Sequence, residues 1–435
     1  MTRRHAATEA PRTALPVLLG AIAAVLVVGA VVVALGQRAG TPTGHDAATT
    51  RSEAAAVVTT APPSPSSTPT PDAELTIVAT GDVLPHTPVI SSARTSDGYD
   101  FAPLLAGLDP WVSAADLALC HLEVPVAPPG VRPSGYPIFG APKAIARDLA
   151  AQGWDGCSTA SNHSVDRGWA GVEATLDALD SAGLGHVGTA RSQREADQPQ
   201  VYELERAGRT VRIAHLAATY GTNGMPVDDD KPWSVDLIDT DRIIDQAKAA
   251  RDDGADLVVA SIHCCVEYQT EPTAEQEQTA ATLAASGEID LLIGHHAHVP
   301  QPLARLEGGP GGDGMWVAYG LGNYLSNQSG ECCTPKSDSG IMLTATALVP
   351  AEGPVRVTGA EWTAVTVSRP AKHKVFALSE ITDGGGKLSA KEVRARYERV
   401  RKAAGTGAPE RTAPVSPTGP PPTVVPRAGG GSTPD

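Results

Sequence analysis

Six short segments of this sequence carry acidic, amide or imidazole side chains, and most of them directly follow an apolar run typical of a β-strand. Open α/β sheets bind their ligands at the carboxyl ends of the strands. Acids, amides and imidazoles that converge there from several strands are suited to holding two divalent metals. The segments are Gly81-Asp82, Leu122-Glu123, Ser161-Asn162-His163 with Asp166, His263, His295-His296-Ala297-His298 and Gly322-Asn323.

The histidines at 295–298 are the most specific of these signals. His296 and His298 follow the apolar run DLLIG and are separated by one residue, so a short extended turn can direct both at one point. Three of the chain's twelve histidines lie in these four positions, which core packing explains poorly. We predict that His296 and His298 bind metal and that His295 supports them from behind.

Other candidates are less specific on their own. Asp82 follows a strand and a glycine, where a turn aspartate is a common alternative to a ligand. Glu123 ends the run ALCHLE and could bridge two cations, with a loop or helix-start acid as the alternative. Asn323 could contact substrate, hold the histidine loop or simply complete a turn. His86 fits an ordinary loop histidine as well as a ligand, and His121 has no clear assignment.

Asn162 and His163 could act side by side as a ligand and a general acid. The Asn162 amide offers a neutral oxygen to a metal, and His163 could protonate a leaving group. Asp166 could orient His163 or cap the helix that follows. His263 ends an apolar strand and is either a ligand or a satisfied core histidine, and Glu267 could hydrogen-bond to ligands.

The hydrophobic pattern predicts the elements that position these residues. Apolar, β-branched runs alternate with windows of helical spacing, and hairpin-like strands follow near the end. This order favours α/β layers around a mixed central sheet, and no dinucleotide, NTPase or serine-hydrolase motif is present. We expect strands at 74–80, 116–120, 154–160, 211–218, 256–262, 290–294, 315–319, 340–348 and 355–367, and helices at 168–182, 239–251 and 273–286.

Composition predicts a single-pass protein of the cell membrane whose main domain lies outside the cytoplasm. The uncharged run 15–36 is long enough to span a bilayer, and the arginines before it keep the N-terminus cytoplasmic. A cleaved signal peptide is the alternative, and it would also export the main domain. The expected parts are a cytoplasmic N-terminus 1–14, a transmembrane signal anchor 15–36, a disordered Pro/Ser/Thr linker 37–73, a folded domain 74–370, a charged helical extension 371–403 and a disordered tail 404–435.

The net charge narrows the range of partners. A formal net charge of −15 argues against nucleic acid. It also argues against binding of a polyanionic polymer by simple electrostatic attraction. An anionic substrate would therefore need metals or a local basic groove.

The chain has six cysteines, and an even set in an exported domain suggests disulfides. The adjacent pairs Cys264-Cys265 and Cys332-Cys333 lie beside candidate site segments, so we expect crosslinks between those two loops, with a zinc cluster as the alternative. Cys120 and Cys157 lie in apolar strands and are expected to be buried thiols.

In these same stretches the chain resembles the CapA family of poly-γ-glutamate capsule biosynthesis proteins, which are similar to calcineurin-type metallophosphoesterases. The matching stretches are TIVATGD, DLALCHLE, STASNHSVDRG, TYGTNG, SIHCCVEY, DLLIGHHAHVPQP and VAYGLGNYLSNQ, which span about 75–350. The resemblance implies a layered, metallophosphatase-like (calcineurin-like) α/β sandwich with mixed central sheets and two divalent metals, Mn, Fe or Zn. It also implies an envelope polymer such as poly-γ-glutamate, membrane synthase or export subunits, and the membrane itself as partners.

The resemblance also implies site roles. The phosphoesterase D-x-H is Asp82-Val83-Leu84 here, which removes one ligand. His121 and Ser161 stand where Asn is usual, and Cys264-Cys265 stands where Trp-Gly is usual. Carried over residue by residue, Asp82 and His298 belong to one metal, Glu123 bridges, Asn162, His263 and His296 belong to the second metal, and His163 is the general acid.

Two functions compete at this point. The first is a membrane-anchored metallohydrolase that cuts a phosphoester, amide or ester of an envelope polymer. The second is a non-catalytic component that binds or guides the polymer in a poly-γ-glutamate synthesis or export complex. A metal site is expected in both.

Overall fold

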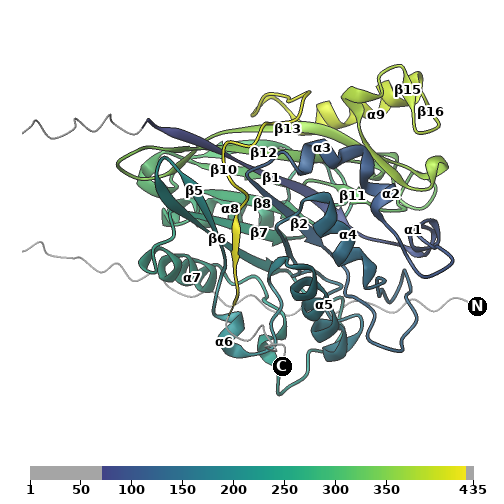
Figure 1. Ribbon diagram of the computed structural model, residues 1–435, viewed down its shortest axis with the longest axis horizontal. Helices are drawn as coiled ribbons and strands as arrows, with labels where there is room; N and C mark the ends of the chain where they lie inside the picture. Colours follow the sequence, from purple (N-terminus) through teal and green to yellow (C-terminus); the bar gives the residue numbers. More distant parts are fainter. Residues whose placement is uncertain (1–70, 428–435) are drawn as a thin grey trace, which may run out of the picture. The chain divides into compact units, whose positions relative to one another are not determined.

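Two mixed β-sheets packed against each other form the centre of the folded domain (Figure 1). The structure is a computed structural model that describes residues 71–427. The expected cytoplasmic N-terminus, the signal anchor and nearly all of the linker lie outside the described residues. None of the helices within 71–427 has the length and apolar character needed to cross a membrane.

The first sheet contains the strands that carry the N-terminal half of the candidate site. Its central strands are parallel, and its C-terminal strands are antiparallel neighbours. In spatial order they are β14 (Lys374–Ala377), β13 (Arg356–Ser368), β12 (Ser339–Val349), β1 (Ala73–Val83), β2 (Leu117–Leu122), β3 (Gly156–Ser158) and β4 (Gly185–Val187), with β11 (Asn323–Leu325) paired to the end of β1.

The second sheet carries the other half of the site on three parallel strands. In spatial order its strands are β17 (Thr423–Val425), β5 (Gln200–Arg206), β6 (Arg209–Thr219), β7 (Leu257–His263), β8 (Leu291–His295), β10 (Met315–Ala318) and β9 (Leu303–Leu306). A two-stranded hairpin, β15 (Gly384–Gly385) and β16 (Leu388–Ser389), stands apart from both sheets.

Strand alternation explains how two layers of core form. Leu75 and Ile77 of β1 point into the core between the sheets, where they meet Leu257 and Val259 of β7. Val78, one residue on, faces the opposite side and joins the core beneath the first sheet's helices. Full burial of each such side chain stabilises the fold by about 1.5–3 kcal/mol. The expected layered α/β sandwich with mixed sheets is confirmed.

Helices cover the outer faces of the sheets, and their ends follow ordinary capping chemistry. Helix α8 begins at a capping box in which Thr273 and Gln276 satisfy each other's backbone amides. Helix α5 ends at Gly183, whose φ of 76° closes the helix in a left-handed turn. The helices are α1 (Thr87–Ser92), α2 (Ala102–Leu105), α3 (Asp109–Val112), α4 (Ala144–Gln152), α5 (Gly168–Ala182), α6 (Gln193–Ala196), α7 (Thr240–Asp252), α8 (Ala274–Ser286) and α9 (Ala390–Ala404).

The segment after α9 differs from the disordered tail expected from 404 onwards. Within the described residues it runs along the domain and pairs with β5 as strand β17. Asp116 accepts hydrogen bonds from the backbone and hydroxyl of Thr418, and the Arg427 guanidinium is buried on the carbonyls of His186 and Thr189. The expectation failed because a Pro- and Thr-rich segment can borrow a partner from an open sheet edge.

Candidate metal centre

The strand registers bring the candidate residues into two facing rows. In the first sheet Asp82 of β1 pairs with His121 of β2 and with Asn323 of β11. In the second sheet His263 of β7 pairs with His295 of β8. Except for Asn323, which begins β11, these residues lie at or near the carboxyl ends of parallel strands, where α/β sheets present ligand sites.

Two glycines allow the backbone to approach closely at these strand ends. A Cβ on Gly81 would overlap the carbonyl oxygen of Gly322, the oxygen to which the Asp82 amide donates a 2.8 Å hydrogen bond. A Cβ on Gly294 would overlap the carbonyl oxygen of Tyr319 in the same way. Only glycine fits at both positions, so local sequence sets the spacing of the residues that follow.

Asp82, Glu123 and His298 form a fully buried cluster of two carboxylates and an imidazole. Their ligand atoms all lie within 4.8 Å of one another. His298 Nδ1 is 2.8 Å from Asp82 Oδ2, and His298 Nε2 is 3.6 Å from Glu123 Oε1. His295 also lies at this cluster, with its Nδ1 3.6 Å from Asp82 Oδ1. The structure therefore brings together three residues that are spread over 216 positions of the sequence.

A second cluster of imidazoles adjoins the first. His263 Nε2 lies 2.8 Å from Asn162 Oδ1, and its Nδ1 lies 2.9 Å from His121 Nε2. The His296 ring is 4.8 Å from the His263 ring and 5.8 Å from the His298 ring. Asn162, His263 and His296 thus meet at one place, and Asp82 also lies within 4.8 Å of His121 and His263.

Several polar atoms in these clusters have no hydrogen-bond partner although they are buried. Within residues 71–427 this holds for both carboxylate oxygens of Glu123, Asp82 Oδ1, His295 Nδ1, His296 Nδ1 and Asn323 Oδ1. Buried polar groups in folded proteins are normally paired, so a concentration of unpaired ones fits residues that could hold an ion. Carboxylate, amide and imidazole donors together suit Mn, Fe or Zn.

Burial and neighbouring charges perturb the titration of the cluster. Burial raises the pKa of Glu123 well above its usual value, and the neighbouring Asp82 charge adds to this. Burial opposes the charged form of Asp82, but its contacts with the His295 and His298 imidazoles outweigh burial and hold the pKa of Asp82 well below its usual value. Burial likewise opposes charge on His298, but Glu123 and Asp82 raise its pKa to about 9.

Three other imidazoles of the centre have lowered pKa values, which favours their neutral form. Burial, reinforced by the charge of His298, lowers the pKa of His296 to about 3. Burial and the surrounding histidines also lower the pKa values of His121 and His263. Neutral imidazole is the form that binds a metal, so this environment favours ligation.

His163 and Asp166 form a hydrogen-bonded pair beside the clusters. His163 Nδ1 is 2.9 Å from Asp166 Oδ2, which also accepts a 2.7 Å hydrogen bond from the Phe139 amide. The Phe139 ring meets the His163 ring edge to face at 4.7 Å. Asp166 therefore orients His163, and helix α5 begins only at Gly168, beyond the position that a capping role would need.

The loop after β8 is held in an unusual conformation. His296 and His298 have φ values of 83° and 54°, a region that residues other than glycine rarely adopt. Asn323 holds this loop because its side-chain amide donates to the His298 carbonyl at 3.2 Å. Tyr268 adds a second tie, from its backbone amide to the Ala297 carbonyl at 2.8 Å. The orientation of the His296 and His298 side chains therefore depends on these contacts.

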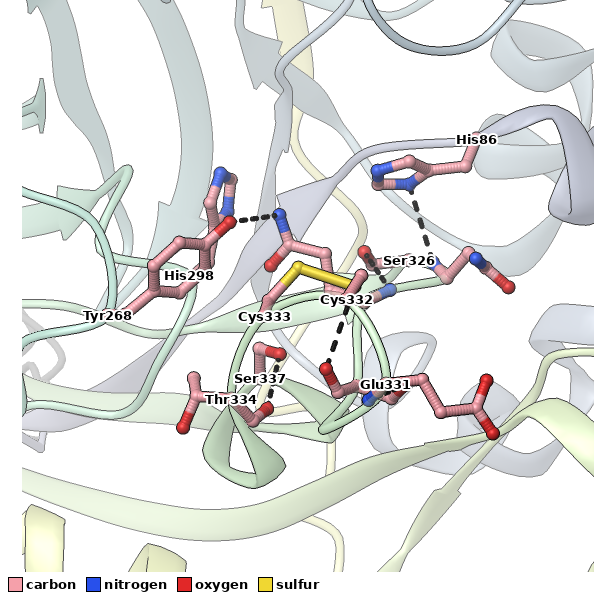
Figure 2. Close-up of a disulfide and its surroundings, with 12 residues drawn as sticks. His86, Tyr268, His298, Ser326, Glu331, Cys332, Cys333, Thr334 and Ser337 are labelled. Atoms are coloured by element: carbon pink, nitrogen blue, oxygen red, sulfur yellow. Dashed lines mark hydrogen bonds between the residues drawn. A yellow bond between two sulfur atoms is a disulfide. The ribbon is translucent and has the colours of Figure 1, made fainter.

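A cavity of about 470 Å³ opens beside His298 and His163. Figure 2 shows the Cys332–Cys333 disulfide at its wall, near Tyr268, His298 and His86. Glu267 also lines the cavity, and its carboxylate lies within 4.8 Å of ligand atoms of His296 and His298. The cavity gives a substrate direct access to the edge of the cluster.

The cysteine expectations need two corrections. Cys264 bonds to Cys265 and Cys332 bonds to Cys333, so the two loops are not crosslinked. The reason is that Cys264 is buried under α8, whereas Cys332 and Cys333 are exposed at the cavity wall. Cys120 and Cys157 are not free thiols but form a disulfide.

The register of the sheet explains this third bond. Strands β2 and β3 are parallel neighbours, and Cys120 pairs with Cys157 across them. Their Cα atoms lie 4.4 Å apart, within disulfide reach. Apolar surroundings in the sequence gave no signal of this pairing.

Three residues near the centre were missed. His121 shares the imidazole cluster, but its position on β2, two residues before Glu123, did not by itself assign it a role. Asn223 accepts a 3.2 Å hydrogen bond from Asn162, and the Tyr220 ring lies 4.7 Å from the His296 ring. Both belong to the TYGTNG stretch, which forms the loop after β6.

His86 is not part of the metal-ligand groups found among the described residues. It lines the cavity instead, with Nδ1 2.9 Å from the Leu84 carbonyl oxygen. Burial lowers its pKa to about 4. The loop-histidine interpretation fits these contacts.

Two proteins with known names are similar to this chain in sequence. PGA biosynthesis protein CapA of Bacillus subtilis (strain 168) is 29% identical over 172 residues, which are 39% of this chain and 42% of that protein. A probable polyglutamine synthesis accessory protein of Mycobacterium tuberculosis is 26% identical over 183 residues, which are 40% of this chain and 46% of that protein. The matches thus span less than half the length of these curated relatives.

The chain also shows a likeness to solved structures. NAD nucleotidase of Haemophilus influenzae has a TM-score of 0.44 at 14% identity, covering 77% of this chain and 64% of that one. The calcineurin-like phosphoesterase YfkN from Bacillus subtilis has a TM-score of 0.41 at 14% identity, covering 76% and 98%.

The profile of the family described as Bacterial capsule synthesis protein PGA_cap matches residues 76–328. This match covers more than half of the chain and includes every strand end that contributes to the clusters. This chain therefore belongs to the bacterial capsule synthesis protein family.

Proposed function

We propose that this chain is a membrane-anchored, extracytoplasmic hydrolase that uses divalent metals to cut a phosphoester or amide bond of a capsular polymer. The observation that carries the proposal is the set of buried, unpartnered carboxylate and imidazole atoms next to a cavity that His163 lines. A purely structural role would not explain why several buried polar atoms of Asp82, Glu123 and His296 are left without partners.

The donor set fits two ions, Mn, Fe or Zn. We assign each residue to one ion according to which other ligands lie next to it. Asp82 and His298 would hold one ion, Asn162, His263 and His296 would hold the other, and Glu123 would bridge. Divalent metals bound there supply Lewis acidity and a water of lowered pKa.

The rest of the machinery belongs to the chain itself. Asp166 accepts a hydrogen bond from His163 Nδ1, and this contact fixes the orientation of the His163 ring. His163 Nε2 is then the atom that can give a proton to a leaving group in the cavity. Asn323 keeps the histidine loop in place through the His298 carbonyl.

The relatives point to the substrate. One is named for PGA biosynthesis and the other for polyglutamine synthesis. We therefore propose poly-γ-glutamate, or the bond that attaches it to its carrier, as the polymer, and membrane synthase or export subunits as partners.

The test is metal content, measured by plasma mass spectrometry on the purified full-length chain. The wild type is compared with a His296→Ala/His298→Ala double variant and with His186→Gln, a control that changes a buried histidine outside the clusters. We expect about two equivalents of metal in the wild type and in the control, and loss in the double variant. Absence of metal after reconstitution with each ion would overturn the proposal.

Activity is then measured on phosphoesters and γ-glutamyl amides with the reconstituted chain. Glu123→Gln and His163→Ala are expected to abolish hydrolysis, while only Glu123→Gln changes metal content. Hydrolysis that persists in His163→Ala would remove the general-acid role. Full metal loading without turnover of any capsular polymer would favour a non-catalytic polymer-binding or export role.

A further inference from the structure

The cavity beside the metal centre contains no lysine or arginine among its lining residues. Its charged or titratable lining groups are Glu267, His86, His163 and His298, together with Tyr136 and Tyr268. A chain with a net charge of −15 needs positive charge elsewhere to hold an acidic polymer. Such positive charge would have to come from another part of the fold.

Positive charge is concentrated near the C-terminal end of the domain. Residues 369–402 contain ten Lys and Arg but only four Asp and Glu, and they hold five of the chain's nine lysines. Most of the four acids are already engaged. Glu380 accepts from Trp111 Nε1 at 2.6 Å, Glu392 caps helix α9, and Glu398 pairs with Arg401.

Three of these lysines line one open hollow of about 540 Å³, here called the lysine groove. They are Lys372, Lys374 and Lys387, and all three are exposed. None of them has an ion-pair or hydrogen-bonding partner for its ammonium group in the described part of the chain. Three unneutralised ammonium groups around one hollow form a strong local positive potential.

The lysine groove has firm walls. Gly107, in the 3₁₀ turn Ala106–Leu108, packs so closely on β14 that a Cβ there would overlap the Val375 carbonyl oxygen. On the hairpin side, a Cβ on Gly386 would overlap the Phe376 ring, which also lines the groove. The groove is therefore a preformed feature of the fold with charged rims and an apolar patch.

The groove and the metal cavity are linked through one side chain. His373 lies between Lys372 and Lys374, and its Nε2 is 2.9 Å from Asn327 Oδ1. Asn327 lines the metal cavity, and its backbone nitrogen lies 3.4 Å from His86 Nδ1. The segment that carries two of the groove lysines is therefore joined to the lining of the metal cavity through His373 and Asn327.

We propose that the lysine groove binds a polycarboxylate chain and holds it beside the metal centre. The identity of that chain rests on the proposed function, in which the substrate is a polyglutamate polymer. Lysine ammonium groups act as point charges that tolerate different carboxylate spacings, which suits a flexible polymer. Methylene groups between the carboxylates can pack on the Phe376 ring.

The shape of the groove favours a chain over a membrane surface. The lysines surround a hollow, so a narrow polymer can reach all three at once, whereas a flat bilayer cannot enter it. Polyphosphate and anionic lipid vesicles are therefore comparison probes in the test.

The test is fluorescence anisotropy with labelled γ-linked polyglutamate and the full-length chain in a neutral detergent. A chelator is present, so metals contribute nothing to binding. A Lys372→Gln/Lys374→Gln/Lys387→Gln variant is compared with Lys143→Gln/Arg194→Gln/Lys248→Gln, which removes the same charge from exposed positions outside the groove. Thermal unfolding checks that both variants fold.

We expect salt-sensitive binding by the wild type, about tenfold weaker binding by the groove variant and a change of less than about twofold in the control. Lys374→Glu should weaken binding more than Lys374→Gln. Equal losses in both triple variants, or tighter binding to polyphosphate or to phosphatidylglycerol vesicles than to polyglutamate, would overturn the proposal. Loss of hydrolysis in His163→Ala with unchanged polymer binding separates this groove from the catalytic proposal.

Discussion

Replacing Glu123 by Gln should change the stability of this protein in opposite directions with and without metal. The Glu123 carboxylate is fully buried, and neither of its oxygens has a hydrogen-bond partner within residues 71–427. A buried group left unsatisfied costs about 1–3 kcal/mol, and more when it is charged. The nearest charge, His298, keeps its shorter contact with Asp82 in the variant.

Without metal, we therefore expect Glu123→Gln to leave the free energy of unfolding unchanged or to raise it by about 1–3 kcal/mol. With metal, the wild type should gain about 2.7 kcal/mol at a metal concentration one hundred times the dissociation constant. The variant lacks the bridging carboxylate and should gain much less. The order of stability then reverses between the two conditions.

The assay is urea unfolding followed by tryptophan fluorescence, in chelator and in excess Mn²⁺ or Zn²⁺. Asp148→Asn is the control, because its buried carboxylate is satisfied by the Phe101 amide at 2.7 Å. We expect the control to be destabilised by about 1–2 kcal/mol in both conditions, with an unchanged metal increment. A metal-free Glu123→Gln protein that is less stable than wild type by more than about 1 kcal/mol would refute the reasoning.

Three further changes test the fold around the site. Burial raises the pKa of Asp155 to about 7, although a hydrogen bond from the Ala118 amide opposes this shift. The stability contributed by the protonated carboxyl group is therefore present below about pH 4 and is lost as the pH rises through 7. Between pH 4 and pH 8, the free energy of unfolding of Asp155→Asn, measured by urea unfolding, should rise by as much as about 4 kcal/mol relative to wild type. Gly294→Ala forces the backbone apart before the histidine loop, so it should lower the free energy of unfolding by at least about 1–3 kcal/mol and should also lower the metal content. Gly359 has open space around it, so Gly359→Ala should keep its metal. Replacing both Cys120 and Cys157 by Ala removes a disulfide between residues 37 positions apart. This change should lower the free energy of unfolding, measured in urea, by up to about 4 kcal/mol. An unchanged midpoint would show that the disulfide contributes little to stability.

The alternation of strands and helices was predictable because it depends on local periodicity. The helix expected at 168–182 is α5, and the strands expected at 256–262 and 290–294 are β7 and β8 to within one residue. Strands β5 and β17 were not predicted. β5 is polar on one face, and β17 exists only because β5 offers it a partner edge.

The candidate site was predictable as a set of residue types but not as contacts. Asp82, Glu123, Asn162, His263, His296 and His298 could be chosen because each follows a strand, and the structure brings them together. Their ligand roles remain predictions. His121 could not be assigned from sequence, because its role depends on a cross-sheet contact with His263, 142 positions away.

The sequence by itself determined which side chains stand at strand ends, because strand periodicity and glycine positions are local properties of the chain. It also determined the acidic charge balance and the basic segment near the C-terminus. Only the tertiary structure decided which residues share a site, which cysteines pair and where the lysines form a groove. These depend on sheet register and on the packing of one sheet against another, and such long-range contacts leave no local signal.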